Sequence, residues 1–212
     1  MEANQNQARK LEAVQLECVR DDRVLFKDFG FTLETGQALL VEGPNGSGKT
    51  SLLRLLCGFR QPDAGEIFWN GESAENNAQY YSEMAYVGHL DGIKKELTVE
   101  ENLKLAQAMT LASSLSIEQA LKKVRMTGYE DMRVGVLSAG QKRRIAFARL
   151  LVTRNRLWIL DEPYTALDKS GIILFEALMT EHVNNDGMMI LTSHHDVLLP
   201  DVDVQTVVLG NG

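Results

Sequence analysis

The fold of this 212-residue chain is decided by one stretch, Gly43-Pro44-Asn45-Gly46-Ser47-Gly48-Lys49-Thr50. The stretch matches every fixed position of the phosphate-binding loop pattern G-x-x-x-x-G-K-[ST]. Residues 37–42 before it (QALLVE) are short and apolar enough for a buried strand, and residues 51–56 after it (SLLRLL) read as a helix that stops near Gly58. A strand, loop and helix in this order predict that the chain binds a nucleoside triphosphate.

The residue types in the loop fit that chemistry. The glycines let backbone N–H groups turn toward a polyphosphate without a clashing Cβ, and the start of the helix adds its positive end. We expect Lys49 to neutralise the β- and γ-phosphates and the Thr50 hydroxyl to bind Mg²⁺. A glycine-rich turn that matches by chance is the alternative, and the flanking strand and helix argue against it.

Composition narrows the class of protein. The net charge is −7, so no overall basic field recruits nucleic acid. Cys18 and Cys57 are too few for a disulfide framework, and Cys57, in the apolar helix after the loop, is expected to be a buried thiol. The sequence contains no apolar run near the ~18 residues of a membrane span, and its first residues lack the apolar region of a signal peptide. We therefore expect a cytoplasmic protein whose membrane role, if it has one, comes through a partner.

Hydrophobic patterning predicts a single α/β domain over residues 11–212, after a disordered tail over residues 1–10. A helical segment from about residue 98 to residue 127 belongs to a helical subdomain at about residues 90–150, inserted in a strand-rich core. The predicted strands are an antiparallel pair at 11–19 and 24–33, a hairpin with Asn70-Gly71 at its turn, and further strands at 84–87, 157–160, 188–191 and 204–209.

A second motif follows one of these strands. Residues 157–160 (LWIL) are apolar and lead into Asp161-Glu162-Pro163, which places two carboxylates at the carboxyl edge of the sheet, where α/β folds bind ligands. Asp161 suits the Mg²⁺ shell, directly or through water, and Glu162 suits the general base that orients an attacking water. The alternative is a strand that simply ends in an acidic turn, and the phosphate loop makes that alternative weaker.

A third motif, Leu137-Ser138-Ala139-Gly140-Gln141, opens a predicted amphipathic helix over residues 142–151 with basic and apolar faces. Ser138, the small residues and the helix N-terminus form a second anion-binding surface. The competing interpretation is a helix cap with no further purpose.

The order of these motifs, followed by Ala166-Leu167-Asp168 and Thr192-Ser193-His194, resembles the ABC-family ATPase domain from about Leu11 onward. The resemblance implies a phosphate-loop NTPase core of ABC type with an antiparallel β subdomain and a helical insertion. It also implies ATP hydrolysis with Mg²⁺ by a head-to-tail homodimer in the ATP-bound state. The implied ATP-binding residues beyond the phosphate loop are Ser138, Gly140 and Gln141, acting on the other subunit's nucleotide, and Asp168.

The same resemblance assigns His194 as the histidine that contacts the γ-phosphate and holds the attacking water. His195 is adjacent to it in the sequence, so the assignment depends on position. The strand at 188–193 leads directly into His194, and we interpret His195 as a solvated surface histidine.

Two positions depart from the ABC pattern. Where most members carry a glutamine that reaches Mg²⁺, this chain has His89, and imidazole is a poor ligand for a hard, oxygen-seeking ion. We expect His89 to act through water or through a partner contact. The region that usually supplies an aromatic residue for adenine has none, so we expect Arg20 to stack on the base or Val19 to pack against it.

Within the ABC family, residues 88–94 and 97–103, the stretch from Trp158 to Asp168 and the missing adenine aromatic resemble the haem-exporter ATPases of cytochrome c maturation. That resemblance implies a peripheral protein on the cytoplasmic face of the inner membrane, with integral-membrane permease subunits as partners. Its ATP hydrolysis would drive haem export or release a haem-loaded chaperone. The alternatives are an ABC transporter for another small molecule and a soluble ABC ATPase, whose usual second domain, long insertions and tails are missing here.

Overall fold

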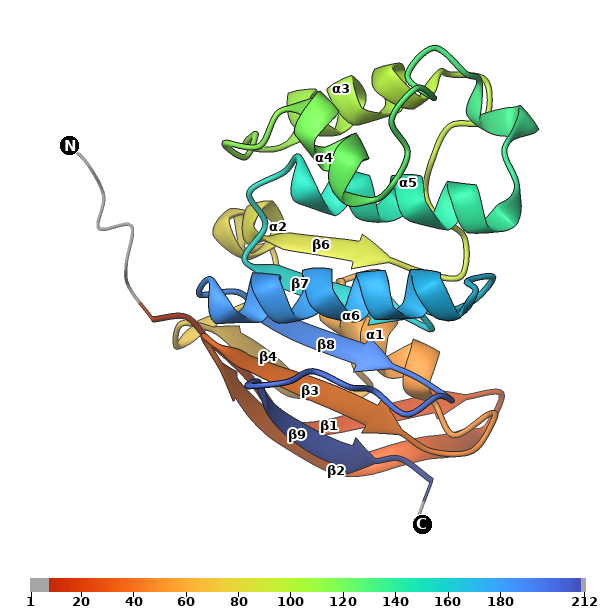
Figure 1. Cartoon of the computed structure of the whole chain (residues 1–212). Coiled ribbons are helices and arrows are strands. Elements are labelled where there is room, and N and C mark those ends of the chain that lie inside the picture. Colours follow the sequence, from red (N-terminus) through yellow and green to blue (C-terminus); the bar gives the residue numbers. More distant parts are fainter. Residues whose placement is uncertain (1–7, 211–212) are drawn as a thin grey trace, which may run out of the picture.

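The computed structural model describes residues 8–210. Two sheets form the framework, and six helices surround the parallel one or lie between the two (Figure 1). The strands are β1 (Lys10–Arg20), β2 (Arg23–Glu34), β3 (Gln37–Glu42), β4 (Ala64–Trp69), β5 (Glu72–Ser73), β6 (Met84–Val87), β7 (Leu157–Asp161), β8 (Met188–Thr192) and β9 (Asp203–Val208). The helices are α1 (Lys49–Leu56), α2 (Ala78–Glu83), α3 (Val99–Met109), α4 (Ile117–Lys123), α5 (Ala139–Leu151) and α6 (Lys169–Asn184).

The larger sheet is parallel, with the strand order β6-β7-β8-β3-β9, and the smaller one is antiparallel, with the order β2-β1-β4-β5. This arrangement confirms the predicted α/β class with an antiparallel β subdomain. The strand pair β1 and β2 and the hairpin turn at Asn70 and Gly71 are also confirmed, the two turn residues having φ values of 54° and 82°. Positive φ at both positions is what a two-residue hairpin turn requires.

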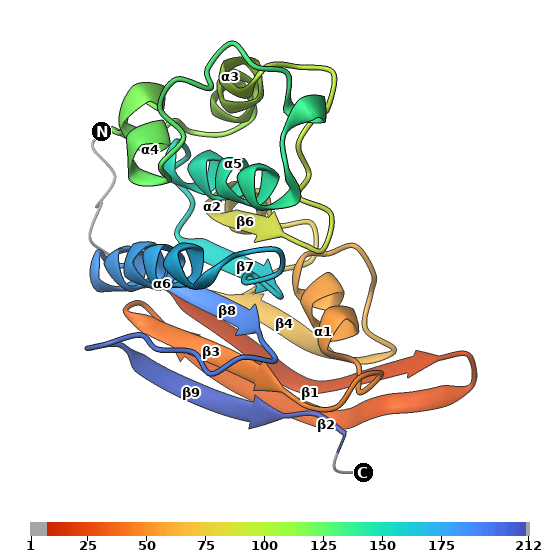
Figure 2. The ribbon, with the colours of Figure 1, turned by 45° about the vertical axis from the view of Figure 1, so that its right-hand side comes forward.

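The parallel sheet separates two hydrophobic cores because side chains alternate along each strand. In β7, Leu157 and Ile159 point into the core shared with α1 and the antiparallel sheet. Trp158 and Leu160 point into the core shared with α5 and α6. Figure 2 shows α6 and α1 on opposite faces of this sheet. Burial on both faces explains why these strands read as continuous apolar runs in the sequence.

The helical part of the chain, α3 to α5, lies beyond the edge strand β6 (Figure 1). The continuous helical segment expected from about residue 98 to residue 127 is wrong in detail, because residues 110–116 separate α3 from α4. Ser116 takes an extended conformation and accepts a hydrogen bond from the Gln119 N–H, so it begins a new helix with a capping box. Ser113 donates to the Leu151 carbonyl oxygen instead of continuing α3.

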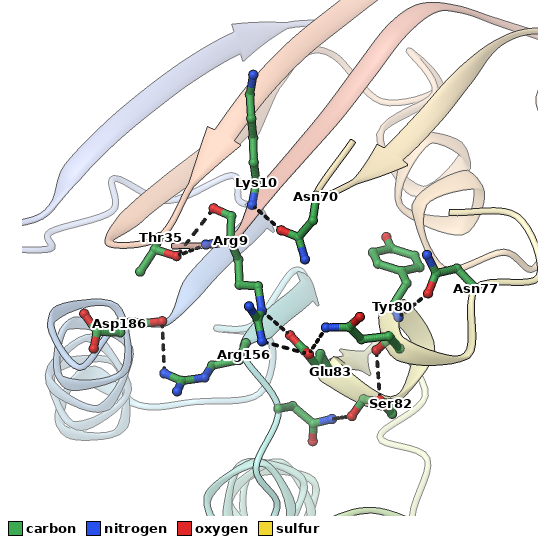
Figure 3. A network of polar contacts seen from close by, with 12 residues as sticks. Arg9, Lys10, Thr35, Asn70, Asn77, Tyr80, Ser82, Glu83, Arg156 and Asp186 are labelled. Carbon is green, nitrogen blue, oxygen red and sulfur yellow. Dashed lines mark hydrogen bonds and ion pairs between the residues drawn. The ribbon is translucent and has the colours of Figure 1, made fainter. Parts of the chain in front are cut away.

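Polar contacts tie the amino-terminal ends of several strands together (Figure 3). Arg9 donates through Nε to Glu83, at the end of α2, over 2.8 Å, and its N–H donates to the Thr35 hydroxyl between β2 and β3 over 2.7 Å. Asn155, before β7, donates to the carbonyl oxygens of Ser82 and Met84. The network joins the antiparallel sheet to the edge of the parallel one at the end remote from the phosphate loop.

Of the expected disordered tail at residues 1–10, residues 1–7 lie outside the described residues. Lys10 already belongs to β1. Cys57 is buried, as expected, and burial raises the pKa of its thiol, which keeps it neutral. Over residues 8–210, none of the helices combines the length and the apolar character needed to cross a membrane.

Removing a large side chain where α5, β7 and α6 meet should lower the stability of the protein measurably. Phe147 is fully buried, stacks on Phe175 at a centroid distance of 3.7 Å and meets the edge of Trp158. We expect Phe147→Ala to lower the free energy of unfolding by about 3–5 kcal/mol, since it leaves a cavity that the neighbours fill only partly. Urea denaturation followed by circular dichroism measures this. Met109→Ala, at a 76% exposed position, is the control and is expected to cost far less.

Candidate functional site

The carboxyl ends of β3, β7 and β8 surround a cavity of about 380 Å³. Strands that run parallel all present the residues after their last hydrogen bonds at the same edge, which is where α/β sheets bind ligands. The cavity is lined by Arg20, Leu25, Asn45, Gly46, Gly48, Lys49, Thr50, Ser51, Asp161, Glu162 and His194. Residues from four separate segments of the sequence therefore meet in one place.

The phosphate loop closes one side of this cavity, and its path depends on glycine. Gly43 has a φ of 143°, and a Cβ there would collide with the carbonyl oxygen of Leu209. Gly48 has a φ of 102°, and a Cβ there would lie 3.1 Å from the Cβ of Leu25. Only glycine adopts this path without strain, so the loop backbone can line the cavity directly. The other loop residues, Pro44, Asn45, Gly46 and Ser47, complete the turn between β3 and α1.

Lys49 brings a buried positive charge to the phosphate loop. Its side chain is 92% buried, and its ammonium donates to the carbonyl oxygens of Gly43 over 2.6 Å and Pro44 over 3.3 Å. These bonds hold the charge within the loop, beside the first turn of α1, whose backbone also favours anions. The arrangement is suited to polyphosphate.

Asp161 and Thr50 face each other across the cavity floor. The Thr50 hydroxyl lies 3.4 Å from the Asp161 Oδ1, and the same oxygen accepts a hydrogen bond from the Thr192 hydroxyl over 2.9 Å. A hydroxyl and a carboxylate side by side are the hard oxygen donors that Mg²⁺ prefers. The donor set therefore fits a magnesium ion.

Glu162 and His194 form a second pair at the cavity. The Glu162 N–H donates to the Thr192 hydroxyl over 3.0 Å, and its carboxylate Oε1 lies 3.3 Å from the His194 Nε2. Glu162 has a φ of 49°, a conformation that non-glycine residues adopt rarely and that often marks functional sites. This conformation brings a partly exposed carboxylate to the wall of the cavity.

The two adjacent histidines are placed differently. His194 lines the cavity, whereas His195 does not, and the ring of His195 lies 6.3 Å from that of Tyr164. Ser193 fixes the turn between them, because its hydroxyl donates to the His195 carbonyl oxygen and accepts from the His195 N–H.

Arg20 lines the far side of the cavity at the end of β1, with a side chain that is 62% exposed. Leu25, near the start of β2, lines the cavity beside it and did not figure in the sequence analysis, whereas Val19 is absent from the lining. An apolar side chain next to a guanidinium offers a base both packing and stacking contacts. No pattern in the sequence marks Leu25, because only the pairing of β1 with β2 brings it to the cavity.

Tyr86 is another residue near the site that sequence reasoning passed over. It lies in β6, next to β7, and burial together with the neighbouring Asp161 raises the pKa of its hydroxyl to about 12. The phenol is therefore neutral at physiological pH and acts as a hydrogen-bond donor toward Asp161. Only the parallel pairing of β6 with β7 brings Tyr86 near Asp161, so no pattern in the sequence marks it.

The motif at residues 137–141 lies away from the cavity of its own chain. Ser138 is exposed and caps α5, accepting from the Gln141 N–H over 3.2 Å while Gln141 accepts from the Ser138 N–H over 2.9 Å. Gly140 packs so closely on the next loop that a Cβ would lie 2.9 Å from the carbonyl oxygen of Ala166. Ser138, Gly140 and Gln141 are thus grouped on one surface and do not line the cavity.

Asp168 caps α6 by accepting from the Gly171 N–H over 2.8 Å, and this bond is the main reason that the pKa of its carboxyl is lowered. It too is absent from the cavity lining, as is His89, which is exposed on the segment after β6. The expected basic face of α5 needs a correction, because Arg143 is 97% buried and its guanidinium points into the protein.

Comparisons with known proteins agree with this geometry. A family model described as ABC transporter matches residues 26–165. The cytochrome c biogenesis ATP-binding export protein CcmA of Aliivibrio fischeri is 42% identical over 94% of this chain and 99% of its own length. The protein of the same name from Nitrosomonas europaea is 45% identical over 94% of this chain and 95% of its own length.

Solved structures show the same fold. An ABC transporter ATP-binding protein from Pyrococcus furiosus superposes with a TM-score of 0.81 at 26% identity, over 94% of this chain and 97% of its own.

If the buried ammonium of Lys49 binds phosphate, its removal should weaken nucleotide binding. We expect Lys49→Ala to weaken ATP affinity on the order of 10-fold or more, because a hydrogen bond from a charged group to phosphate contributes about 1.5–3 kcal/mol. Isothermal titration calorimetry with ATP measures this. Arg54→Ala is the matched control, because it removes a positive charge from an exposed position on the same helix. Equal affinities for the wild type and Lys49→Ala would contradict the assignment of the loop.

Proposed function

Because the chain belongs to the ABC transporter family, we propose that it is the ATP-hydrolysing subunit of a membrane complex in cytochrome c maturation, which exports haem or releases a haem-loaded chaperone. The observation that carries the proposal is the similarity to cytochrome c biogenesis export proteins, which covers 94% of this chain and 95–99% of their own sequences. The cavity supplies the chemistry, since it combines a phosphate loop with a carboxylate and a histidine.

Five residues that line the cavity are assigned roles in the hydrolysis of ATP. Lys49 and the loop N–H groups bind the β- and γ-phosphates and orient the terminal phosphorus. Glu162 accepts the proton of the attacking water, and His194, 3.3 Å from that carboxylate, holds the water and the γ-phosphate in line. When bound by Thr50 and Asp161, Mg²⁺ supplies positive charge to the phosphate oxygens.

The active form is proposed to be a head-to-tail homodimer. Ser138 is exposed, Gly140 and Gln141 are partly exposed beside it, and none of the three lines the cavity of its own chain, so they are proposed to serve the nucleotide of a second copy. There the N-terminus of α5 contributes its positive end to the γ-phosphate. Asp168 caps α6 at the end of the loop that packs against Gly140, and its proposed role is to sense the opposite site.

The partners are proposed to be integral-membrane permease subunits, which hold the chain on the cytoplasmic face of the inner membrane. His89 is exposed on the segment after β6, where it is available to such a partner or to a water near the magnesium ion. Nucleic acid is not proposed as a partner, because the net charge of −7 gives the chain no overall basic field.

Loss of hydrolysis should produce a specific cellular defect. In a strain that lacks the chain, we expect covalent c-type cytochromes to be lost while b-type ones remain, because b-type haem is not attached covalently. Glu162→Gln should fail to restore them, since it removes the general base and lowers turnover on the order of 10²-fold or more. Glu118→Gln, the same change at an exposed position on α4, should restore them. Haem-stained gels of membranes measure the cytochromes, and phosphate release from the purified proteins measures turnover.

The possible outcomes separate two levels of the proposal. Normal c-type bands in the deletion strain would remove the role in cytochrome c maturation and leave an ABC ATPase with another cargo. Near-normal phosphate release by Glu162→Gln would remove Glu162 as the base.

A further inference from the structure

Arg143, in the second turn of α5, uses its whole guanidinium inside the protein. Its side chain is 3% exposed. Nε donates to the carbonyl oxygen of Pro163 over 3.0 Å, and Nη2 donates to those of Asp161 over 3.1 Å and Glu162 over 2.7 Å. One side chain therefore binds three consecutive carbonyl oxygens, beginning with that of the last residue of β7.

The other nitrogen of the same guanidinium reaches the segment that follows β6. Nη1 donates to the carbonyl oxygen of Gly88 over 2.8 Å and to the Asp91 carboxylate over 3.0 Å. A second arginine of α5 supports that segment, because Arg149 donates to the carbonyl oxygens of Gly92 and Tyr86. Arg143 thus joins α5, the turn at 161–163 and the segment 88–91.

All five N–H donors of the guanidinium have an acceptor in this arrangement. The planar fork sets the angles between these bonds, which a lysine cannot reproduce with three donors on one nitrogen. The arrangement matters at Glu162, whose φ of 49° is unfavourable for a residue with a side chain and has to be held by its surroundings.

We propose that Arg143 is a positioning residue for ATP hydrolysis, which holds Glu162 in its strained conformation and connects it, through Gly88 and Asp91, to the segment proposed to face the membrane partner. A movement of that segment would shift the Arg143 guanidinium and, with it, the backbone that carries the Glu162 carboxylate. The inference rests on the proposed hydrolysis at Glu162, and its failure is distinguishable from a failure of that function.

The test measures kcat, KM and ATP affinity of the purified chain. We expect Arg143→Lys to lower kcat on the order of 10- to 100-fold, because a small displacement of a reacting group has an effect of that size. The Kd for ATP should stay within about twofold, since the hydrogen bonds of Arg143 go to residues 88–91 and 161–163 and not to the phosphate loop. Arg154→Lys, the same change at an exposed position just after α5, should leave both values unchanged.

Asp91 provides a second variant that leaves Arg143 in place. Asp91→Ala removes one acceptor and should lower kcat less than Arg143→Lys does. Asp91→Asn keeps an acceptor oxygen and should restore most of the activity. In the double variant Arg143→Lys with Asp91→Ala, the fall in kcat should be smaller than the product of the single effects, because both changes break the same link.

The outcomes decide the proposal as follows. A folded Arg143→Lys with reduced kcat and unchanged Kd supports it, whereas wild-type kcat, or a parallel loss of ATP affinity, overturns it. If Arg143→Lys does not fold by circular dichroism, Asp91→Ala decides by the same criteria. Absence of hydrolysis in the wild type, or full activity in Glu162→Gln, would instead overturn the proposed function.

Discussion

The parallel pairing of β7 with β8 is the constraint on which the rest of the site depends. The register places Asp161 opposite Thr192, and the Thr192 hydroxyl then bonds both the Asp161 carboxylate and the Glu162 N–H. One hydroxyl therefore sets the positions of two acids, which are proposed to act as the metal ligand and as the general base. Because β3 pairs with the other side of β8, the phosphate loop and Lys49 begin at the same edge. A shift in register would separate phosphate, metal and base.

The second constraint is that α5 contributes both to the surface around Ser138 and to the support of the backbone at Glu162. Its first residues, from Ser138, form an exposed surface that does not reach the cavity of the same chain. Its next turn, through Arg143, grips the backbone around Glu162 from within. In the proposed dimer, the helix that presents Ser138 to one nucleotide also holds the base that acts on the other. This gives a physical route by which the two sites affect each other and the segment at residues 88–91.

Much of the fold could be predicted because its strands are buried on both faces or alternate regularly, and the phosphate loop and the Asp161-Glu162 pair follow apolar runs of that kind. What escaped prediction depends on tertiary contacts. The chain breaks between α3 and α4 for two reasons. Ser113 donates to the carbonyl oxygen of Leu151, and Ser116 begins a new helix as its N-cap. Leu25 comes to the cavity only through the pairing of β1 with β2. Arg143 looked like part of a solvated basic face, because its acceptors are carbonyl oxygens of segments distant in the sequence, which carry no side-chain pattern.

In the proposed dimer, each chain holds half of an ATP site and a second copy completes it. Sedimentation velocity of Glu162→Gln, with and without Mg²⁺ and ATP, tests this most directly, because a variant that binds but hardly hydrolyses ATP keeps the nucleotide in place. We expect the mass of one chain without nucleotide and of two chains with Mg²⁺ and ATP. When the substitution Ser138→Arg is combined with Glu162→Gln, we expect the mass of one chain under both conditions. A single-chain mass at saturating ATP, or a dimer unaffected by Ser138→Arg, would contradict the proposed dimer.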